Sequence, residues 1–378
     1  MAEHRGMGIY DELGVTPLIN AWGTVTAVGG SLMPPEVVEA MREASLSFVD
    51  LHLLHRRAGE EIARLLGVEA ACVTSGAAAG LTIAAAASRA SGASGAPSAV
   101  RDECVILRAH RSRYDQAVTI GGTRIVEVSS GAAADVDDLR AALTPRTALV
   151  LYLAEAEEAP GSLALGTVAG VLEGTGVPLV VDAAAELPPR SNLRRFLDGG
   201  ADLVIVSGGK EIRGPQSSGL ILGRADLIAQ CTALCFPNHG IGRGMKTDKE
   251  TIAGLVRAVD LYVRRDEDAE LRAWDRMVAE LVAALDAHPL LRARRHTLSE
   301  PGIQPASIPR AFVAPLGSSA SEVAARLLAG EPPVVVGVDG EELAINPQCL
   351  DPRQLPILVR AMERAIRPPA SVRPSGGP

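Results

Sequence analysis

Aromatic residues are scarce in this chain of 378 residues, where phenylalanine, tyrosine and tryptophan together make up only 3%. Alanine, leucine and valine must therefore fill the core, since hydrophobic residues still reach 47%. Basic residues are in short supply too, because the net charge is −8 and the isoelectric point lies near 5.5. This balance argues against an extended surface for nucleic acid or an anionic membrane.

Long apolar segments and a disulfide framework are also lacking. No apolar run reaches the roughly 18 residues of a membrane span, and the first residues, "MAEHRGMGIYDELG", contain no apolar core of a secretory signal. The five cysteines are odd in number and scattered. Cys231 and Cys235 are spaced like half of a zinc site, but no second ligand pair follows, so we predict packed thiols and no metal. These features predict a cytoplasmic protein.

Short apolar runs alternate with helical stretches in the first part of the chain. The runs lie at 70–76, 103–110, 123–129, 147–154, 177–184, 201–209 and 218–223. Most of them are continuous, which is typical of strands covered on both faces. Strands that alternate with helices predict an α/β fold with a mostly parallel sheet. The last run follows the previous one too closely for a helical crossover, so we expect it to return antiparallel.

The pattern changes in the last third of the chain. From Thr247 to about Ala287 it becomes long, charged and helical. Weaker strand candidates and a closing helix follow at 309–317, 332–340, 341–346 and 351–366. We therefore predict a large domain over 46–260 and a smaller α+β domain over 261–367. The tail at 368–378 is rich in proline and glycine, which predicts disorder.

Three of the predicted strands are followed by residues that can bind a ligand or take part in catalysis. They lie at the sheet edge where open α/β folds bind ligands. The first is followed by Ser75, Gly76 and Ala77, which open a helix and offer backbone N–H groups to an anion, although a tight helix cap looks the same. The fifth ends in Asp182, whose carboxylate by itself suits a metal, a helix cap or a protonated ring nitrogen. The sixth leads to Lys210, an amine that desolvation makes nucleophilic.

Taken together, these groups meet the needs of pyridoxal 5'-phosphate. The phosphate needs backbone donors, the pyridine nitrogen needs an acid, and the aldehyde needs an amine. Ser207 is placed to add a hydroxyl group to the phosphate site. We predict that Lys210 forms an aldimine with this cofactor and that Asp182 supports a quinonoid at the α-carbon of the substrate.

Three segments of the sequence resemble a known family. They are "LINAWGTVTAVGGSLMPPEVVEAM" (18–41), "SGGKEIRGPQSSG" (207–219) and "NHGIGRGMK" (238–246). They are similar to fold-type I pyridoxal-phosphate enzymes, in the group that contains selenocysteine synthase and D-glucosaminate-6-phosphate ammonia lyase. The resemblance implies the fold-type I transferase fold, with a seven-stranded sheet in the large domain. It also implies an N-terminal segment, 1–45, that covers the active site, and a homodimer or larger homo-oligomer with shared sites.

The resemblance further implies roles for individual residues. His110 is expected to stack on the pyridine ring as part of the catalytic site. The residues expected to contact the substrate or an anionic group are Asn20, Thr24, Gln116, Arg243 and Lys246. Gln116 stands where lyase-like members often carry a histidine. Arg56 and Arg57 are candidate holders of a substrate carboxylate, or plain surface charges of a helix.

We predict an enzyme that acts at the α-carbon of an amino acid or amino-sugar acid, most directly a β-eliminating lyase or dehydratase with Lys210 as the base. A decarboxylase, an oxygen-using decarboxylase or oxidase, and a racemase need the same groups and stay open. The acidic segment 153–162 and the change at Gln116 indicate a substrate unlike that of the lyase.

Two other classes of function are less favoured. Selenium transfer on seryl-tRNA needs a nucleic-acid partner, whereas the chain is acidic and the segment that leads into its cofactor domain is expected to start near residue 10. A non-catalytic relic is disfavoured because Lys210, Asp182 and Ser75 are retained together. We expect a small-molecule amine as the substrate, with no nucleic-acid or membrane partner.

Overall fold

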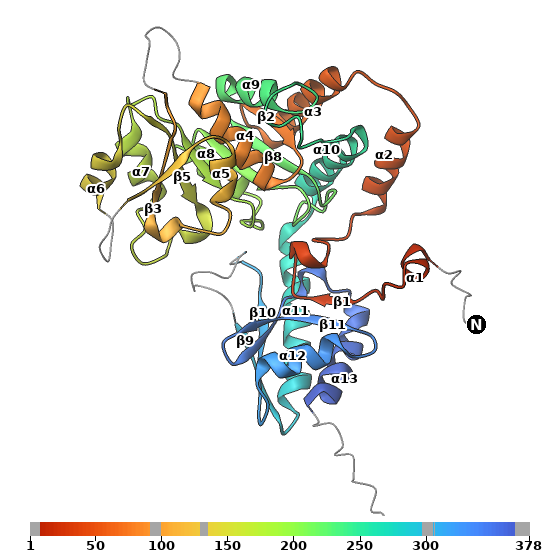
Figure 1. The fold of residues 1–378 in the computed structure, drawn as a ribbon. Coiled ribbons are helices and arrows are strands. Elements are labelled where there is room, and N and C mark those ends of the chain that lie inside the picture. The colour runs from red at the N-terminus through yellow and green to blue at the C-terminus, as the bar shows by residue number, and fades with distance from the viewer. Residues whose placement is uncertain (1–7, 91–99, 129–134, 297–304, 306, 367–378) are drawn as a thin grey trace, which may run out of the picture. The chain divides into compact units, whose positions relative to one another are not determined.

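The seven apolar runs form one seven-stranded sheet in the computed structural model, which describes residues 8–90, 100–128, 135–296, 305 and 307–366 (Figure 1). The strands are β2 (Ala70–Thr74), β3 (Glu103–Leu107), β4 (Arg124–Val128), β5 (Thr147–Leu153), β6 (Leu179–Asp182), β7 (Leu203–Ser207) and β8 (Gly219–Gly223). Their order across the sheet is β2-β8-β7-β6-β5-β3-β4. β8 runs antiparallel to both of its neighbours, and the other pairs are parallel. The predicted α/β class and the antiparallel return of the last strand are confirmed.

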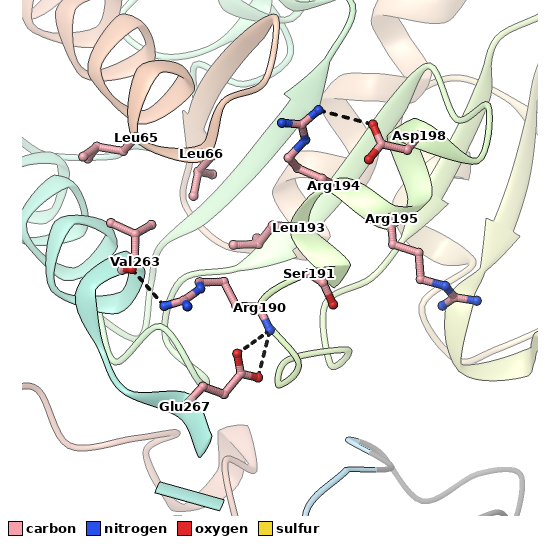
Figure 2. A pocket seen from close by; sticks show the side chains of 10 residues that line it. All are labelled: Leu65, Leu66, Arg190, Ser191, Leu193, Arg194, Arg195, Asp198, Val263 and Glu267. Atoms are coloured by element: carbon pink, nitrogen blue, oxygen red, sulfur yellow. Dashed lines mark hydrogen bonds and ion pairs between the residues drawn. The ribbon is translucent and has the colours of Figure 1, made fainter. Parts of the chain in front are cut away.

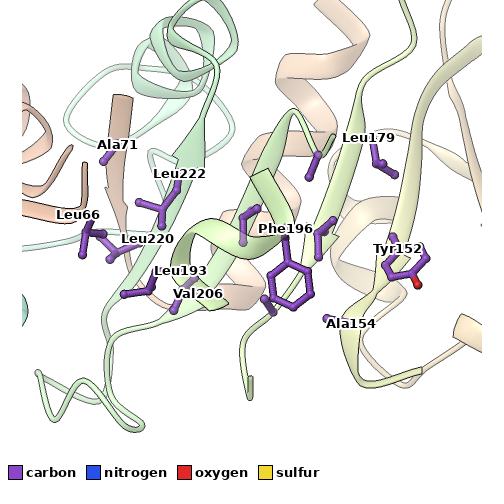
Figure 3. Packing of buried hydrophobic residues seen from close by; sticks show 14 of the residues in the cluster. Leu66, Ala71, Tyr152, Ala154, Leu179, Leu193, Phe196, Val206, Leu220 and Leu222 are labelled. Carbon is purple, nitrogen blue, oxygen red and sulfur yellow. The ribbon is translucent and has the colours of Figure 1, made fainter. Parts of the chain in front are cut away.

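Both faces of this sheet are apolar, because successive side chains of a strand point to opposite faces. On β3, Val105 and Leu107 belong to one buried cluster and Cys104 and Ile106 to the other. The helices that pack on the first face are α3 (Leu51–Leu66), α7 (Leu165–Leu172), α8 (Asn192–Asp198) and α10 (Lys249–Arg264). Those on the second face are α4 (Ala77–Ala90), α5 (Gln116–Ile120) and α9 (Ala225–Leu234). Figure 3 shows Phe196 of α8 directed at the sheet.

The helical pattern predicted over Thr247 to Ala287 forms two helices. Asp248 caps the start of α10, since its carboxylate accepts the Thr251 N–H at 2.7 Å. At the other end, the Arg190 guanidinium donates to the carbonyl oxygens of Val263 at 2.8 Å and of Arg265 at 3.1 Å. These bonds satisfy carbonyls that the helix end leaves unpaired. The chain turns there, and α11 (Glu267–Asp286) begins as a separate helix.

A second sheet belongs to the smaller unit, in the order β1-β11-β12-β10-β9. Its strands are β1 (Ile19–Ala21), β9 (Leu291–His296), β10 (Arg310–Pro315), β11 (Val334–Asp339) and β12 (Glu342–Ile345). Its other elements are α1 (Ile9–Glu12), α12 (Ala320–Leu328) and α13 (Leu355–Ile366). The sequence pattern did not predict β9, since "LRARRH" is mostly basic and joins the sheet through backbone pairing with β10.

The chain divides into two compact units. The larger comprises Gly29–Glu267 and Ser299–Ser307, and the smaller comprises Met1–Val28, Asp268–Leu298 and Ile308–Pro378. The segment 1–45 is thus divided after Val28, and its covering role stays a prediction. The tail predicted at 368–378 lies outside the described residues. Within the described ranges, no helix combines the length and the apolar character needed to cross a membrane.

Candidate active site

Neighbouring parallel strands bring the predicted chemistry to one edge of the large sheet. Asp182 is the last residue of β6, and it lies in register with Leu153 of β5 and Ile205 of β7. β7 then ends at Ser207, and Lys210 follows three residues later. The register therefore places the carboxylate and the turn that carries the amine at the carboxyl ends of adjacent strands, as the sequence predicted.

The turn that carries Lys210 is shaped by glycine and held by a second segment. A Cβ atom at Gly209 would lie 2.4 Å from the Cα atom of Gln216, so only glycine fits there without a shift of the backbone. From the other side, the Ser31 hydroxyl donates to the carbonyl oxygens of Gly209 at 3.1 Å and of Lys210 at 2.7 Å. These contacts fix the backbone at Lys210 and do not involve its side chain.

The Lys210 amine is available for chemistry. Within the described residues, its Nζ atom takes part in no hydrogen bond or ion pair. Burial lowers the pKa of this amine, and the charges of Asp182, Glu155 and Glu186 oppose that shift. Because desolvation disfavours the charged form, a larger fraction of the amine is neutral and nucleophilic at a given pH than for an exposed lysine.

The Asp182 carboxylate has one oxygen held and one oxygen open. Its Oδ1 atom accepts the Ala184 N–H at 3.1 Å, whereas Oδ2 accepts no hydrogen bond from a described residue. The side chain is only 7% exposed, and burial raises its pKa against the opposing effects of the Ala184 N–H and the Lys210 charge. A protonated ring nitrogen at Oδ2 would supply the missing positive partner, so the site fits the pyridine ring of the predicted cofactor.

The start of α4 provides an anion site. Gly76 has a φ of +114°, a conformation that favours glycine, and its carbonyl oxygen accepts the Thr74 hydroxyl at 3.0 Å. A Cβ atom at Gly219 would lie 2.5 Å from the Gly76 carbonyl carbon, so β8 packs closely beneath this turn. The first N–H groups of the helix, from Ala77 onward, have no intrahelical acceptor, and the helix dipole adds positive potential. The Ser207 hydroxyl makes no hydrogen bond with the described residues, so these groups fit a phosphate.

His110 is fully buried, with both ring nitrogens occupied. Nδ1 accepts the Leu153 N–H at 2.9 Å, so Nε2 carries the proton and donates to the Ser162 hydroxyl at 2.8 Å. The ring lies edge-on to Tyr152, with 4.3 Å between the ring centroids. Burial lowers the pKa of His110 to about 4, and the ring is neutral at pH 7. The buried, neutral ring therefore carries no positive charge at neutral pH, and its stacking on a cofactor stays a prediction.

Gln116 lies beside the anion site. It is the first residue of α5, and it lines a pocket of about 360 Å³ together with Ala78 and Ala79 of α4 and Met245. The pocket thus joins the helix start to the segment 238–246, in which the two predicted anion-binding side chains lie. Of these, Lys246 is exposed and Arg243 packs over the Phe236 ring, 5.2 Å from its centroid.

The other predicted contacts have local partners. The Asn20 side-chain amide donates to the Gly23 carbonyl oxygen at 2.8 Å and accepts the Trp22 N–H at 2.9 Å, so it holds a turn after β1. Thr24 follows that turn in the smaller unit. Their roles toward the substrate stay predictions. Arg56 and Arg57 are exposed on α3 and both pair with Glu60, as surface charges of a helix do.

Two glutamates at the site were not singled out from the sequence. Glu155 follows the end of β5, and Glu186 lies four residues after Asp182. The charges of both glutamates raise the pKa of the Lys210 amine, against the effect of burial. The position of Glu155 after a strand end was a usable signal, because the carboxyl ends of parallel strands meet at this edge of the sheet.

A pocket of about 760 Å³ lies elsewhere on the larger unit, away from these groups (Figure 2). It is lined by several arginines that already have partners. The Arg190 side chain bonds the end of α10, its backbone N–H donates to Glu267 at 2.9 Å, and Arg194 pairs with Asp198 at 3.5 Å. The Arg190 side chain is thus engaged at the end of α10.

The cysteines of the larger unit pack as buried thiols. Cys231 and Cys235 are both buried, and the Cys235 sulfur lies 3.4 Å from that of Cys72. Across the described ranges, no three His, Cys, Asp or Glu side chains are grouped so as to hold a metal ion.

Comparisons with known proteins identify the family of the chain. The family model for L-seryl-tRNA selenium transferase, SelA, matches residues 18–295. The chain is 35% identical to D-glucosaminate-6-phosphate ammonia lyase of Salmonella typhimurium, over 85% of this chain and 87% of that protein. It is 33% identical to 5'-C-glycyluridine monooxygenase-decarboxylase of a Streptomyces species, over 94% and 92% of the two chains.

Solved structures extend the comparison. The structure of D-glucosaminate-6-phosphate ammonia-lyase has a TM-score of 0.80 and 31% identity, covering 95% of this chain and 98% of that one. An aspartate aminotransferase of Thermus thermophilus has a TM-score of 0.52 at 18% identity over 96% and 99% of the two chains, and it shares the fold.

The fold and the site define a pyridoxal-phosphate-dependent enzyme of fold type I. Lys210, Asp182 and the start of α4 are the groups that would hold the cofactor. Within that class, the chain belongs to the L-seryl-tRNA selenium transferase family.

Proposed function

We propose that the protein is a lyase that removes a β-substituent from an amino acid or amino-sugar acid. The observation that carries this proposal is the pairing of an unengaged Lys210 amine with an Asp182 carboxylate that has one open oxygen, at the edge of one sheet. When bound, pyridoxal phosphate accepts the electrons released as a bond to the substrate α-carbon breaks. This chemistry is common to many reactions, so the residues around the amine must select among them.

Each residue has a part in this reaction. The Lys210 Nζ atom would hold the cofactor aldehyde, and as a free amine it would take the α-proton as the general base. Asp182 Oδ2 keeps the ring nitrogen protonated. The N–H groups at the start of α4, with the hydroxyls of Ser75 and Ser207, hold the phosphate. Buried His110 packs against the ring. We assign Asn20, Thr24, Gln116, Arg243 and Lys246 to the substrate side of the site.

Elimination is favoured by the relative of Salmonella typhimurium, an ammonia lyase that shares 35% identity over 85% of this chain. A second candidate has a specific observation behind it. The monooxygenase-decarboxylase of Streptomyces is 33% identical over 94% of this chain, so an oxygen-using decarboxylation is the alternative reaction. The two reactions differ in the bond that breaks at the α-carbon, C–H in one and C–C in the other.

The partners proposed are a small-molecule amine and a second copy of the chain, with the enzyme acting in the cytoplasm. The net charge of −8 supports a small substrate over tRNA, because few cations are in excess to bind a phosphate backbone. The exposed side chains of Leu46, Phe48 and Val49 support association of subunits, since such an apolar surface is costly in water.

The test joins labelling to product analysis. Borohydride reduction of the holoenzyme should attach the cofactor to the peptide that contains Lys210, and Lys210→Arg should lose both the label and turnover while keeping the positive charge. D-Glucosaminate 6-phosphate and D- and L-serine should then give an α-keto acid and ammonia. Oxygen uptake with release of carbon dioxide and no keto acid would transfer the assignment to the decarboxylase. An unlabelled Lys210 would overturn both.

A further inference from the structure

Glu186 is a buried carboxyl group without a partner at the active site. Its side chain is only 8% exposed, and its carboxyl group makes no hydrogen bond or ion pair with the described residues. Its backbone is fixed, since its N–H donates to the Ala183 carbonyl oxygen at 3.3 Å and its own carbonyl oxygen accepts the Asn192 amide at 2.7 Å. An ionisable group is rarely buried in this way unless it is paired or protonated.

Burial and neighbouring charges keep Glu186 protonated up to a pH of about 7. Burial raises its pKa to about 7, and the charges of Glu155 and Asp182 add to that effect. Arg195 and Lys210 act in the opposite direction, but the Arg195 guanidinium already forms an ion pair with Glu157. Asp182 must carry a negative charge to pair with a ring nitrogen, and Glu155 adds a second negative charge, so ionisation of Glu186 as well is disfavoured.

A neutral acid suits a lysine that must act as a base. A carboxylate next to Lys210 would hold the amine in its protonated form, in which it takes no proton. A protonated Glu186 avoids this effect, and it has a proton to give. We infer that Glu186 is the general acid that protonates the leaving group of the substrate.

This inference rests on the proposed β-elimination and completes its proton balance. The α C–H bond breaks, its proton goes to Lys210 Nζ, and its electron pair forms the double bond between the α- and β-carbons. The bond from the β-carbon to the hydroxyl oxygen breaks, its electron pair leaves with the oxygen, and the Glu186 proton converts that oxygen to water. Transfer of a proton from the Lys210 ammonium to the Glu186 carboxylate, directly or through solvent, then restores both groups.

The test separates the two proton transfers. The holoenzyme is incubated in D2O with D-glucosaminate 6-phosphate, or with D- or L-serine, and deuterium at the α-carbon of recovered substrate is measured beside elimination. Glu186→Gln should reduce elimination by roughly 100-fold or more while exchange stays within about twofold. Glu155→Gln removes a charge near Lys210 but no donor, so it should change both rates by the same factor. Glu158→Gln, an exposed position of the same loop, is the control.

The outcomes distinguish a failure of the Glu186 role from a failure of the proposed lyase activity. Equal losses of exchange and elimination in Glu186→Gln would mean that the residue acts through Lys210, and unchanged elimination would mean that it gives no proton. Either result overturns the role of Glu186 but leaves the proposed lyase activity in place. A wild-type enzyme that eliminates nothing from any of the probes overturns the proposed lyase activity and this role with it.

A second measurement does not depend on turnover. The infrared difference spectrum between wild type and Glu186→Gln should contain the carbonyl band of a protonated carboxyl group, and that band should disappear as the pH rises through about 7. Glu186→Asp should retain a band and part of the elimination rate, which guards against a simple folding defect. The absence of any protonated carboxyl band at pH 6 would overturn the inference.

Discussion

The Ser31 hydroxyl donates a hydrogen bond to the carbonyl oxygen of Lys210 at 2.7 Å, across 179 positions of the sequence. The same hydroxyl also reaches the Gly209 carbonyl oxygen at 3.1 Å. The segment that precedes α2 (Pro35–Ser45) thus holds the backbone of the reactive lysine, and it belongs to the larger unit with that lysine. Ser31 is a positioning residue, because it acts on the amine only through the turn.

Replacing this hydroxyl should affect turnover more than stability. Ser31→Ala removes the hydroxyl donor from both carbonyl oxygens, although Gly209 O keeps the Ser31 N–H at 3.2 Å and Lys210 O keeps the Arg213 N–H at 3.0 Å. We therefore expect unfolding to become easier by only about 1 kcal/mol. The loosened turn should lower kcat by roughly tenfold or more, since small displacements of a catalytic group are costly. Steady-state kinetics and urea unfolding measure the two effects. The control is Ser45→Ala, whose hydroxyl bonds the Arg42 carbonyl oxygen on an exposed face. Equal kcat values in Ser31→Ala and Ser45→Ala would contradict a positioning role of Ser31.

The glycine beside the lysine should not tolerate a side chain. In Gly209→Ala the new Cβ atom would lie 2.4 Å from the backbone of Gln216, so the turn must shift. We expect a loss of roughly 1 to 3 kcal/mol in unfolding free energy and a reduced yield of cofactor bound to Lys210. Gly244→Ala is the matched control, because no atom lies within 4 Å of its added Cβ. Cofactor absorbance and thermal unfolding check the pair, and a fully loaded Gly209→Ala variant would contradict the prediction.

Glu186 should make the fold less stable as the pH rises. Its pKa is raised from 4.5 to about 7, so between these values the folded protein keeps a proton that the unfolded chain has released. The unfolding free energy contributed by this group therefore falls with increasing pH, by up to about 1.4 kcal/mol per unit. Relative to wild type, Glu186→Gln should gain on the order of 3 kcal/mol at pH 8 compared with pH 4.5. Urea unfolding at both pH values measures the difference, and parallel curves would refute it.

His110 should have the opposite dependence. Burial lowers its pKa from 6.5 to about 4, so in this interval the unfolded chain binds a proton that the folded protein excludes. Unfolding free energy is lost as the pH falls from 6.5 to 4, by on the order of 3 kcal/mol in total. The variant His110→Gln should be less stable at pH 7 but should lose less on acidification than wild type. Denaturant titrations at pH 7 and pH 4.5 provide the comparison. An identical acid loss in the two proteins would show that another group is responsible.

Much of the large unit was predictable from local patterns. Runs such as 147–154 are apolar throughout because the strands are covered on both faces. This pattern can be recognised in the sequence without knowing which helices cover the strand. The strand ends also located Asp182 and Lys210, since parallel strands carry their ligands at the carboxyl edge. By contrast, β9 was missed because its basic residues carry no apolar signal and its place is decided by pairing with β10.

The sequence alone determined the class of chemistry, since a strand-end carboxylate, a lysine in a glycine turn and a helix opened by small residues are local features of the chain. Only the tertiary structure decided the burial, the hydrogen-bond partners and the pKa values of those groups. Burial and charge depend on residues distant in sequence, such as Glu155 and Ser31 around Lys210, and neither spacing nor composition records which of them meet. The raised pKa of Glu186 is one such property, because the folded chain excludes water from its carboxyl group.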